Sequence, residues 1–229
     1  MKAMILAAGY GKRLLPLTLE TPKPMLKVAG KPLLQHHIER LAARGICDLV
    51  INTSWLAEQI EGYFGDGSQF GVSINWSREP EPLETGGGIA KALRLLGDQP
   101  FLLINGDIWT DFPLNAVSSA TVADGKTAWL LLVNNPQHNP QGDFGLSNSV
   151  IDYTSAKRYT FSGISVIRPQ LLIDYIQCNP NQASFPLRDA LRPAIEARKV
   201  AGALYHGEWC DVGTLERYQA LNKSLVTDV

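Results

Sequence analysis

Short apolar runs alternate with longer amphipathic segments along most of the chain. The apolar runs have the length and the continuous hydrophobicity of strands that are buried on both faces. They predict strands over residues 3–7, 48–52, 72–76, 101–105, 128–133 and 159–166. The first run is too short for the apolar core of a signal peptide, and no run approaches the ~18 apolar residues of a membrane span. We therefore expect no membrane partner.

Helical periodicity occupies the segments between these runs. Leu34, Ile38 and Leu41 fall on one stripe, while Pro32 stands at the first helical position and Gly45 at the C-terminal cap. Further helices are expected over residues 56–64, 89–96 and 214–225, and from positions 170 and 186 onwards. This alternation predicts an α/β fold with a doubly wound, mostly parallel mixed sheet of the Rossmann-like type.

After residue 135 the alternation of strands and helices becomes less regular, and a turn-rich loop precedes shorter predicted strands. No Gly/Ser-rich linker marks a boundary, so we expect a single domain over residues 1–229, with functionally distinct halves at 1–110 and 111–229. Ligands of open α/β sheets bind beyond the carboxyl ends of the strands. Chemistry is therefore expected in the loops that follow residues 7, 76 and 105.

Charge and cysteine content narrow the class of protein. The 229 residues include 21 Lys and Arg and 22 Asp and Glu, which gives a net charge of −1. This balance does not favour binding to nucleic acid, which is a polyanion. Cys47, Cys178 and Cys210 form no CxxC pair and are odd in number, which argues against a disulfide framework and a zinc site. We expect a reducing, cytoplasmic compartment. The sequence does not indicate an oligomeric state.

A glycine loop follows the first predicted strand. Gly9 and Gly11 fit neither a GxGxxG fingerprint, because position 14 is leucine, nor a phosphate-binding P-loop. Their backbone N–H groups can nevertheless face a polyanion, with Lys12 and Arg13 adding positive charge beside it. This pattern predicts a triphosphate pocket, although a solvated glycine turn accounts for the segment equally well.

Three further charged residues are candidates for the same chemistry. Lys23 lies between Pro22 and Pro24, where restricted extended geometry would hold its ammonium group. Asp107 follows the predicted strand at 101–105, and Asp211 lies in a late loop. Mg²⁺ is usually held by one or two carboxylates together with substrate phosphates. Each aspartate on its own is also typical of a turn or a helix start.

The segment from Ala7 to Leu34, AAGYGKRLLPLTLETPKPMLKVAGKPLL, resembles the N-terminal signature of the sugar-1-phosphate nucleotidyltransferases, roughly AAGxGxRLxPxTxxxPKPxxxxxxKPxL. The family's GD and WxDVGT motifs are matched at positions 106–107 and 209–214. The resemblance implies transfer of a nucleotidyl group from a nucleoside triphosphate to a sugar 1-phosphate, with Mg²⁺ on Asp107 and Asp211. It makes residues 1–110 the nucleotide-binding half and residues 111–229 the sugar-binding half.

The resemblance also assigns roles to individual residues. Arg13, Lys23 and Asp107 are expected to be catalytic. The expected nucleotide-binding residues are Ala8, Gly9, Gly11, Lys12, Arg13, Lys23, Glu79, Gly86 and Gly87, and the expected substrate-binding residues are Asn105, Asp143 and Gly163. Gly86 and Gly87 should lie just before a helix, with their backbone near the base. Glu79 falls where the family usually has glutamine.

Segments 52–60, 81–89, 104–112 and 134–147 most resemble family members that act on a cell-wall sugar. The likeness implies UTP as donor, N-acetylmuramic acid α-1-phosphate as acceptor, and a role in peptidoglycan recycling. Lys157 or Arg158 would then face the lactyl carboxylate of this acceptor, although both are typical surface residues. Alternatives are thymidylyl or uridylyl transfer to glucose 1-phosphate and guanylyl transfer to mannose 1-phosphate.

Two further classes of protein share parts of this pattern. A non-catalytic nucleotide-binding regulator would lack Asp107 or Asp211, and an NAD-dependent oxidoreductase would need glycine at position 14. Nucleophilic catalysis has no support, because no Ser, Cys and His constellation is recognisable. Adjacent His36 and His37 diverge on a helix and are expected at a partly packed surface, while His138 and His206 are isolated.

Overall fold

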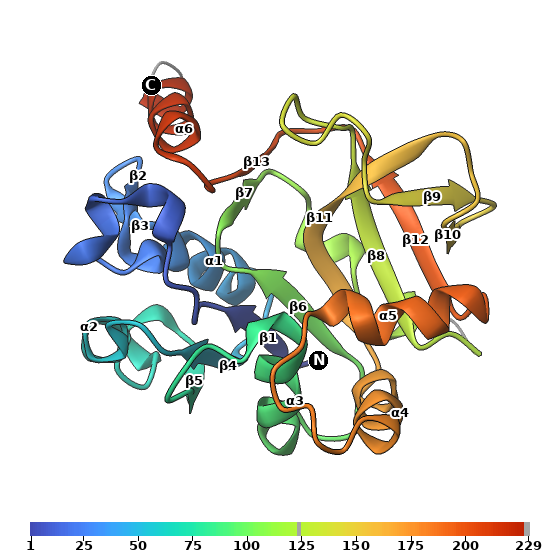
Figure 1. Ribbon diagram of the computed structural model, residues 1–229. Helices are drawn as coiled ribbons and strands as arrows, with labels where there is room; N and C mark the ends of the chain where they lie inside the picture. Colours follow the sequence, from blue (N-terminus) through green and yellow to red (C-terminus); the bar gives the residue numbers. More distant parts are fainter. Residues whose placement is uncertain (123–124, 227–229) are drawn as a thin grey trace.

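The computed structural model describes residues 1–122 and 125–226, which are built around one nine-stranded sheet (Figure 1). Its order is β5-β4-β1-β6-β11-β8-β12-β10-β9, and β11 pairs additionally with β9. Helices cover both faces. The α/β doubly wound architecture predicted from the alternating pattern is thereby confirmed.

Parallel strands make up the N-terminal part of the sheet. They are β1 (Ala3–Leu6), β4 (Asp48–Thr53), β5 (Ser73–Arg78) and β6 (Phe101–Asn105). β1 lies between β4 and β6, with Ile5 opposite both Ile51 and Ile104. All four carboxyl ends therefore meet at one edge of the sheet, where the predicted loops follow.

Antiparallel pairing dominates the other part. The strands are β8 (Ala128–Val133), β9 (Phe144–Ser147), β10 (Val150–Asp152), β11 (Arg158–Ile167) and β12 (Val200–Tyr205). β11 runs antiparallel to β6 and β8, and only β8 and β12 pair in parallel here. Parallel neighbours need a long crossover, and no α-helix lies between β8 and β11, so the chain returns antiparallel.

The two faces of the sheet bury separate cores. One holds Ala3 and Ile5 against α1 (Leu33–Ala42) and α2 (Ala57–Phe64). Met4 points to the other, where it is in the core formed with α3 (Glu84–Leu96), α4 (Gln170–Cys178) and α5 (Leu187–Glu196). α6 (Leu215–Val226) packs away from the main sheet, through Leu221 against Val28 and Val212. Apolar side chains on both faces explain why the strands lack polar alternation.

Helix starts agree with the sequence in most places. Pro32 and Pro186 directly precede α1 and α5, and α4 begins at Gln170. Gly45 has a φ of +69°, three residues beyond the end of α1. The expectation for α3 was wrong by five residues: the helix begins at Glu84 and not at Ile89, so the three glycines at 86–88 lie inside it.

Short elements complete the fold. The 3₁₀ turns are Lys12–Leu14, Leu17–Leu19, Lys23–Met25, Ser68–Phe70, Leu114–Ala116 and Ser119–Thr121. β2 (Lys27–Val28) pairs with β3 (Lys31–Pro32), and β7 (Ile108–Thr110) pairs with β13 (Trp209–Asp211). Within residues 1–122 and 125–226, no helix combines the length and hydrophobicity that a membrane crossing requires.

Candidate active site

A cavity of about 340 Å³ opens at the carboxyl ends of the parallel strands. It is bounded by the loop after β1, the segment after β5 and the end of β6. Seven of the nine expected nucleotide-binding residues line it, namely Ala8, Gly9, Gly11, Lys12, Arg13, Lys23 and Glu79, together with Asn105 and Asp107. The structure thus brings together residues from positions 8 to 107, as the topology predicts.

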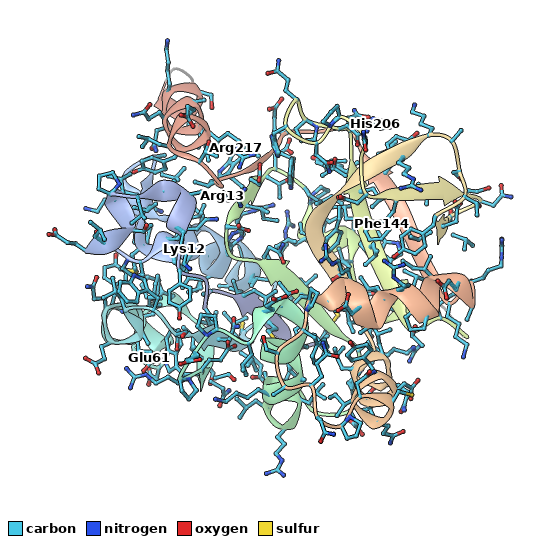
Figure 2. All side chains as sticks on the ribbon, viewed as in Figure 1. Lys12, Arg13, Glu61, Phe144, His206 and Arg217 are labelled. Atoms are coloured by element: carbon cyan, nitrogen blue, oxygen red, sulfur yellow. The ribbon has the colours of Figure 1, made fainter. Side chains whose placement is uncertain are left out.

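The glycine loop owes its shape to Gly11 and Thr18. Gly11 has a φ of +65°, and a Cβ there would lie 2.8 Å from the Thr18 side chain. Buried Thr18 donates its hydroxyl hydrogen to the carbonyl of Gly11 at 2.9 Å. Figure 2 shows Lys12 and Arg13 on this loop, where the chain turns into a short 3₁₀ helix. Their positive charge is therefore held at the mouth of the cavity.

Lys23 forms the shortest ion pair of the site. Its Nζ lies 2.6 Å from Oδ2 of Asp107, and its side chain is only 12% exposed. Pro22 is extended as predicted, but Lys23 itself opens a 3₁₀ turn, since the N–H of Met25 donates to the carbonyl of Pro22. Burial opposes ionisation of Asp107, yet Lys23 and Arg13 hold the pKa of this carboxyl below its usual value.

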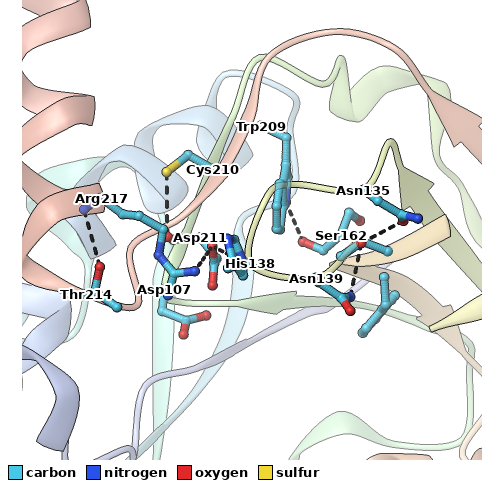
Figure 3. Close-up of polar contacts among 12 residues, drawn as sticks. Asp107, Asn135, His138, Asn139, Ser162, Trp209, Cys210, Asp211, Thr214 and Arg217 are labelled. Atoms are coloured by element: carbon cyan, nitrogen blue, oxygen red, sulfur yellow. Dashed lines mark hydrogen bonds and ion pairs between the residues drawn. The ribbon is translucent and has the colours of Figure 1, made fainter. Parts of the chain in front are cut away.

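The pairing of β7 with β13 brings Asp211 beside Asp107. Asp211 stands opposite Ile108, and the N–H of Val212 donates to the carbonyl of Asp107 at 2.7 Å. Oδ1 of Asp211 lies 3.1 Å from Nε2 of His138 and 3.2 Å from Nη1 of Arg217 (Figure 3). Burial raises the pKa of Asp211, with Arg217 and His138 opposing the rise and Asp107 adding to it.

Two neighbouring carboxylates that repel each other fit a divalent cation. The described residues contain no cluster of three or more His, Cys, Asp or Glu side chains suited to a metal ion. Mg²⁺ does not need one, because substrate phosphates usually complete its oxygen ligands. A cation between Asp107 and Asp211 would remove the repulsion that contributes to the raised pKa of Asp211.

A second cavity of about 300 Å³ meets the first at Asn105 and Asp107. It lies on the side of the C-terminal half. The remaining lining residues are Ile108, His138, Asn139, Thr160, Phe161, Ser162, Gly163, Trp209 and Asp211. Two of the three expected substrate-binding residues, Asn105 and Gly163, therefore line it.

Gly163 makes room for Asn105. Its φ is +84°, and a Cβ would lie 2.9 Å from the Asn105 side chain. The strand register between β11 and β8 shifts at this point, between Phe161 and Ser165. Gly163 thus allows a close approach to its backbone, and the Asn105 side chain is the neighbour that fills the space; contact of Gly163 with the substrate stays a prediction.

Asp143 does not reach the second cavity. Its Oδ1 accepts from Nδ2 of Asn139 at 3.1 Å, and its Oδ2 accepts from the N–H of Phe161 at 2.8 Å. Asp143 is expected to bind the substrate, but it is not among the residues that line either cavity, and both its oxygens already accept hydrogen bonds. Its carboxylate instead fastens the loop at 134–143 to β11.

Glu79 lines the first cavity, but both its oxygens already accept hydrogen bonds. Oε1 accepts from Nδ2 of Asn52 at 2.7 Å, and Oε2 accepts from the N–H of Leu83 at 2.8 Å. Asn52 in turn accepts from the N–H of Ala7 at 2.8 Å. This buried unit ties the glycine loop to β4 and to the segment before α3, so Glu79 shapes the cavity wall.

Gly86 and Gly87 are not at the cavity. Both donate their N–H groups to the carbonyl of Phe185, at 2.8 and 3.1 Å. A Cβ on Gly86 would strike the Phe185 side chain, and one on Gly87 would strike the carbonyl of Ala183. The close backbone approach that the glycines suggested is therefore made by residues 183–185 and not by a base.

The histidines depart from expectation. His37 is 3% exposed, so it is buried and does not lie at a partly packed surface. His138 lines the second cavity together with Asp211, which follows it by 73 positions in the sequence. Arg217 is not among the expected site residues, although it follows the late motif by one helical turn. Lys157 and Arg158 lie outside both cavities, with Lys157 over the Tyr159 ring and Arg158 donating to the Tyr153 carbonyl.

Comparison with known proteins agrees with this geometry. A family model described as "Nucleotidyl transferase" matches residues 2–227. N-acetylmuramate alpha-1-phosphate uridylyltransferase from Neisseria meningitidis is 46% identical over 223 residues, covering 95% of each chain. Mannose-1-phosphate guanyltransferase from Gibberella zeae is 30% identical over 224 residues, covering 93% of this chain and 61% of that protein.

Solved structures share the fold. A putative glucose-1-phosphate thymidylyltransferase from Bacillus anthracis, in complex with a sucrose, superposes with a TM-score of 0.88 at 22% identity, covering 100% of this chain and 96% of that one. HddC from Yersinia pseudotuberculosis superposes with a TM-score of 0.78 at 20% identity, covering 98% and 99%. At such identities the match supports the architecture alone.

Proposed function

Because the chain belongs to the nucleotidyl transferase family, we propose that it transfers a uridylyl group from UTP to N-acetylmuramic acid α-1-phosphate. The products are the UDP-sugar and pyrophosphate. One observation carries the proposal: a cavity with three cationic side chains meets a second cavity at Asp107 and Asn105. A nucleoside triphosphate suits the first cavity and a sugar the second.

The reaction needs positioning and charge stabilisation more than proton transfer. An oxygen of the acceptor phosphate bonds to the α-phosphorus of the triphosphate, and the bond from that phosphorus to the bridging oxygen of pyrophosphate breaks. The acceptor phosphate is already ionised near neutral pH, so no general base is required. The main barrier is repulsion between two anions, which Arg13 and Lys23 reduce from the first cavity.

Asp107 and Asp211 would hold the divalent metal, proposed to be Mg²⁺. When bound, the metal neutralises charge on the phosphate oxygens. Lys23 has a separate part, because its ammonium group on Asp107 faces the first cavity and can turn to a phosphate oxygen. Arg13 lies on the same cavity wall and adds a second positive charge, whose planar guanidinium suits phosphate oxygens.

The proposed metal site predicts that turnover depends on a divalent cation. We expect Asp107→Asn to lower kcat by about 100-fold or more, because one charged ligand of a phosphoryl-transfer metal is lost. Activity should disappear in EDTA and return with added Mg²⁺. Asp111→Asn is the matched control, since this carboxylate accepts from the Tyr205 hydroxyl and lies outside both cavities. Full turnover in excess EDTA would show that no metal is used.

Donor and acceptor identity rest on the 46% identical relative, whose name specifies uridylyl transfer to N-acetylmuramate 1-phosphate. Uracil presents one N–H between two carbonyls. Glu79 lines the nucleotide cavity, but both its oxygens already accept hydrogen bonds, so the choice of donor rests on the relative and not on a contact with Glu79. Chemistry of this kind belongs to the recycling of peptidoglycan sugars in the cytoplasm. Mannose-1-phosphate guanylyl transfer is the second candidate, because several relatives near 30% identity bear that name.

A pyrophosphate-release assay over a grid of substrates tests the proposal. UTP, dTTP and GTP are each combined with the 1-phosphates of N-acetylmuramic acid, N-acetylglucosamine, glucose and mannose. We expect the highest kcat/KM for UTP with N-acetylmuramic acid 1-phosphate. Preference for GTP with mannose 1-phosphate would select the second candidate, and absence of turnover with every pair would indicate a nucleotide-binding regulator.

A further inference from the structure

The charged side chains that line the second cavity are mostly negative, although the proposed acceptor is itself an anion. Among the described residues that line it, Asp107 and Asp211 are carboxylates, and His138 is the single side chain with a basic group. An acceptor that carries a carboxylate besides its phosphate would enter against two negative charges. Such a group needs an N–H donor within the cavity, because an uncompensated buried carboxylate is costly.

Most donors in the cavity wall are already engaged. Both hydrogens of Nδ2 of Asn139 go to Asp143 and Thr160, and the Thr160 hydroxyl donates to Oδ1 of Asn135. Nε1 of Trp209 donates to the carbonyl of Ser162. The Ser162 hydroxyl accepts from the N–H of Ile164 and is 0% exposed. Among the described lining residues, the partly exposed side chains of His138 and Asn105 remain able to meet a ligand.

Hydrogen bonds fix the loop that carries His138. It lies in the loop at 134–143, which Asn135 fastens by donating to the carbonyls of Pro140 and Arg158. Figure 3 shows the His138 ring against Asp211, where Nε2 is 3.1 Å from Oδ1. Oδ1 of Asp211 has no hydrogen-bond partner among the described residues, so Nε2 of His138 lies close to this carboxylate without being committed to it. Its side chain is 39% exposed, so a ligand can reach it from the cavity.

His138 can exchange one carboxylate for another without leaving Asp211 alone. Oδ1 of Asp211 also lies 3.2 Å from Nη1 of Arg217. The phosphate of the acceptor has other partners, because Lys23, Lys12 and Arg13 line the first cavity, which adjoins the second at Asp107. The carboxylate is therefore the anionic group of the acceptor that lacks a partner.

We propose that Nε2–H of His138 binds the lactyl carboxylate of N-acetylmuramic acid 1-phosphate and thereby selects this acceptor over sugars without the lactyl ether. This inference rests on the proposed function and names a specificity-determining residue for it. N-acetylglucosamine 1-phosphate differs from the proposed acceptor by that ether alone. The pair of acceptors therefore isolates the contribution of the carboxylate.

The test is the ratio of kcat/KM for N-acetylmuramic acid 1-phosphate to that for N-acetylglucosamine 1-phosphate, at saturating UTP. We expect His138→Leu to lower this ratio at least tenfold, mainly through KM for the first acceptor. His138→Gln keeps an N–H donor of similar reach and should recover part of the ratio. His206→Gln changes a surface histidine outside both cavities and should leave the ratio as in the wild type.

The outcomes separate the two proposals. If the wild-type enzyme does not favour N-acetylmuramic acid 1-phosphate, the proposed acceptor is wrong whatever His138 does. If the wild type favours it and His138→Leu keeps the same ratio, the role of His138 is overturned and the proposed function stands. Equal losses with both acceptors would also overturn it, because they would show that His138 acts through Asp211 or on the phosphate. Melting temperatures within a few degrees of wild type confirm that the variants fold.

Discussion

At the scale of single residues, His37 shows how burial sets a protonation state. The ring is 3% exposed on α1, and Nε2 has no hydrogen-bond partner among the described residues. Burial lowers the pKa of His37 to about 4, with Arg40 and His36 adding to the effect. The folded protein therefore keeps this ring neutral. The unfolded chain binds the proton more readily, so the contribution to stability is complete above pH ~6.5 and is lost as the pH falls towards 4.

This linkage predicts that His37 makes the fold sensitive to acid. Between pH 7.5 and 5, the free energy of unfolding of the wild type should fall by about 2 kcal/mol more than that of His37→Gln, which cannot titrate there. Urea denaturation at the two pH values measures the difference. Exposed His206→Gln should retain the full wild-type sensitivity. The same loss of stability in His37→Gln would mean that other groups cause it.

Among the residues proposed to stabilise charge, Lys23 is both largely buried and paired with Asp107. We expect Lys23→Ala to lower kcat/KM by about 100-fold, the typical effect of losing one charge-stabilising donor. Lys31→Ala is the control, since Lys31 makes an exposed ion pair with Glu39. Steady-state kinetics with thermal melting distinguishes a catalytic loss from unfolding. Near-normal kcat/KM in Lys23→Ala would remove Lys23 from the mechanism.

At the scale of elements, α3 shows why a glycine run needs its packing partner before it can be interpreted. Gly86 and Gly87 lie in the first turns of the helix, and residues 183–185 cross them so closely that no Cβ fits. Glycine is poor in a helix interior, where it costs roughly 0.5–1 kcal/mol relative to alanine. The contact between α3 and the segment before α5 therefore depends on these positions having no side chain.

A matched pair of substitutions tests this contact. Gly87→Ala should lower the free energy of unfolding by about 1–3 kcal/mol, because the new Cβ displaces the carbonyl of Ala183. Gly62→Ala in α2 has nothing within 4 Å of its Cβ and should raise stability by about 0.5–1 kcal/mol. Urea denaturation of both variants gives the comparison. Stabilisation by Gly87→Ala would show that the helix and the crossing segment are not packed as described.

At the scale of the whole molecule, the two halves share one sheet and both cores. β6 and β11 pair across the boundary, with Ile104 opposite Ile164. The core beneath α1 and α2 includes Val166, and the core beneath α3 to α5 includes Met4. The candidate active site is shared as well, since Asp107 lies before residue 110 and Asp211 after it, and both line the second cavity.

Such continuity predicts one unfolding transition for the chain. Far-UV circular dichroism and tryptophan fluorescence should give the same midpoint in urea, because Trp76 and Trp129 pack against one common core although they come from different halves. Saturating UTP with Mg²⁺ should shift both midpoints together. Two separate midpoints would mean that residues 1–110 and 111–229 unfold as independent units.

The sequence by itself predicted six of the strands, the alternation of the main elements and the loop residues that line the first cavity. Continuous apolar runs such as 101–105 predict buried strands from local composition, and the ordered motif at 7–34 places Gly11, Arg13 and Lys23 within one short stretch of chain. Information of this kind is local, because it depends on neighbours along the chain and on periodicity. The topology of parallel strands then brings Asp107 to the same edge without further assumption.

Only the tertiary structure decided what the isolated residues do. His138 meets Asp211 although 73 positions separate them, and Asp143 turns to the N–H of Phe161 because β11 runs beside its loop. Gly87 meets residue 183, almost a hundred positions away. Such contacts depend on packing between distant segments, and a side chain's burial and partners are set by that packing. No local pattern in the sequence records it.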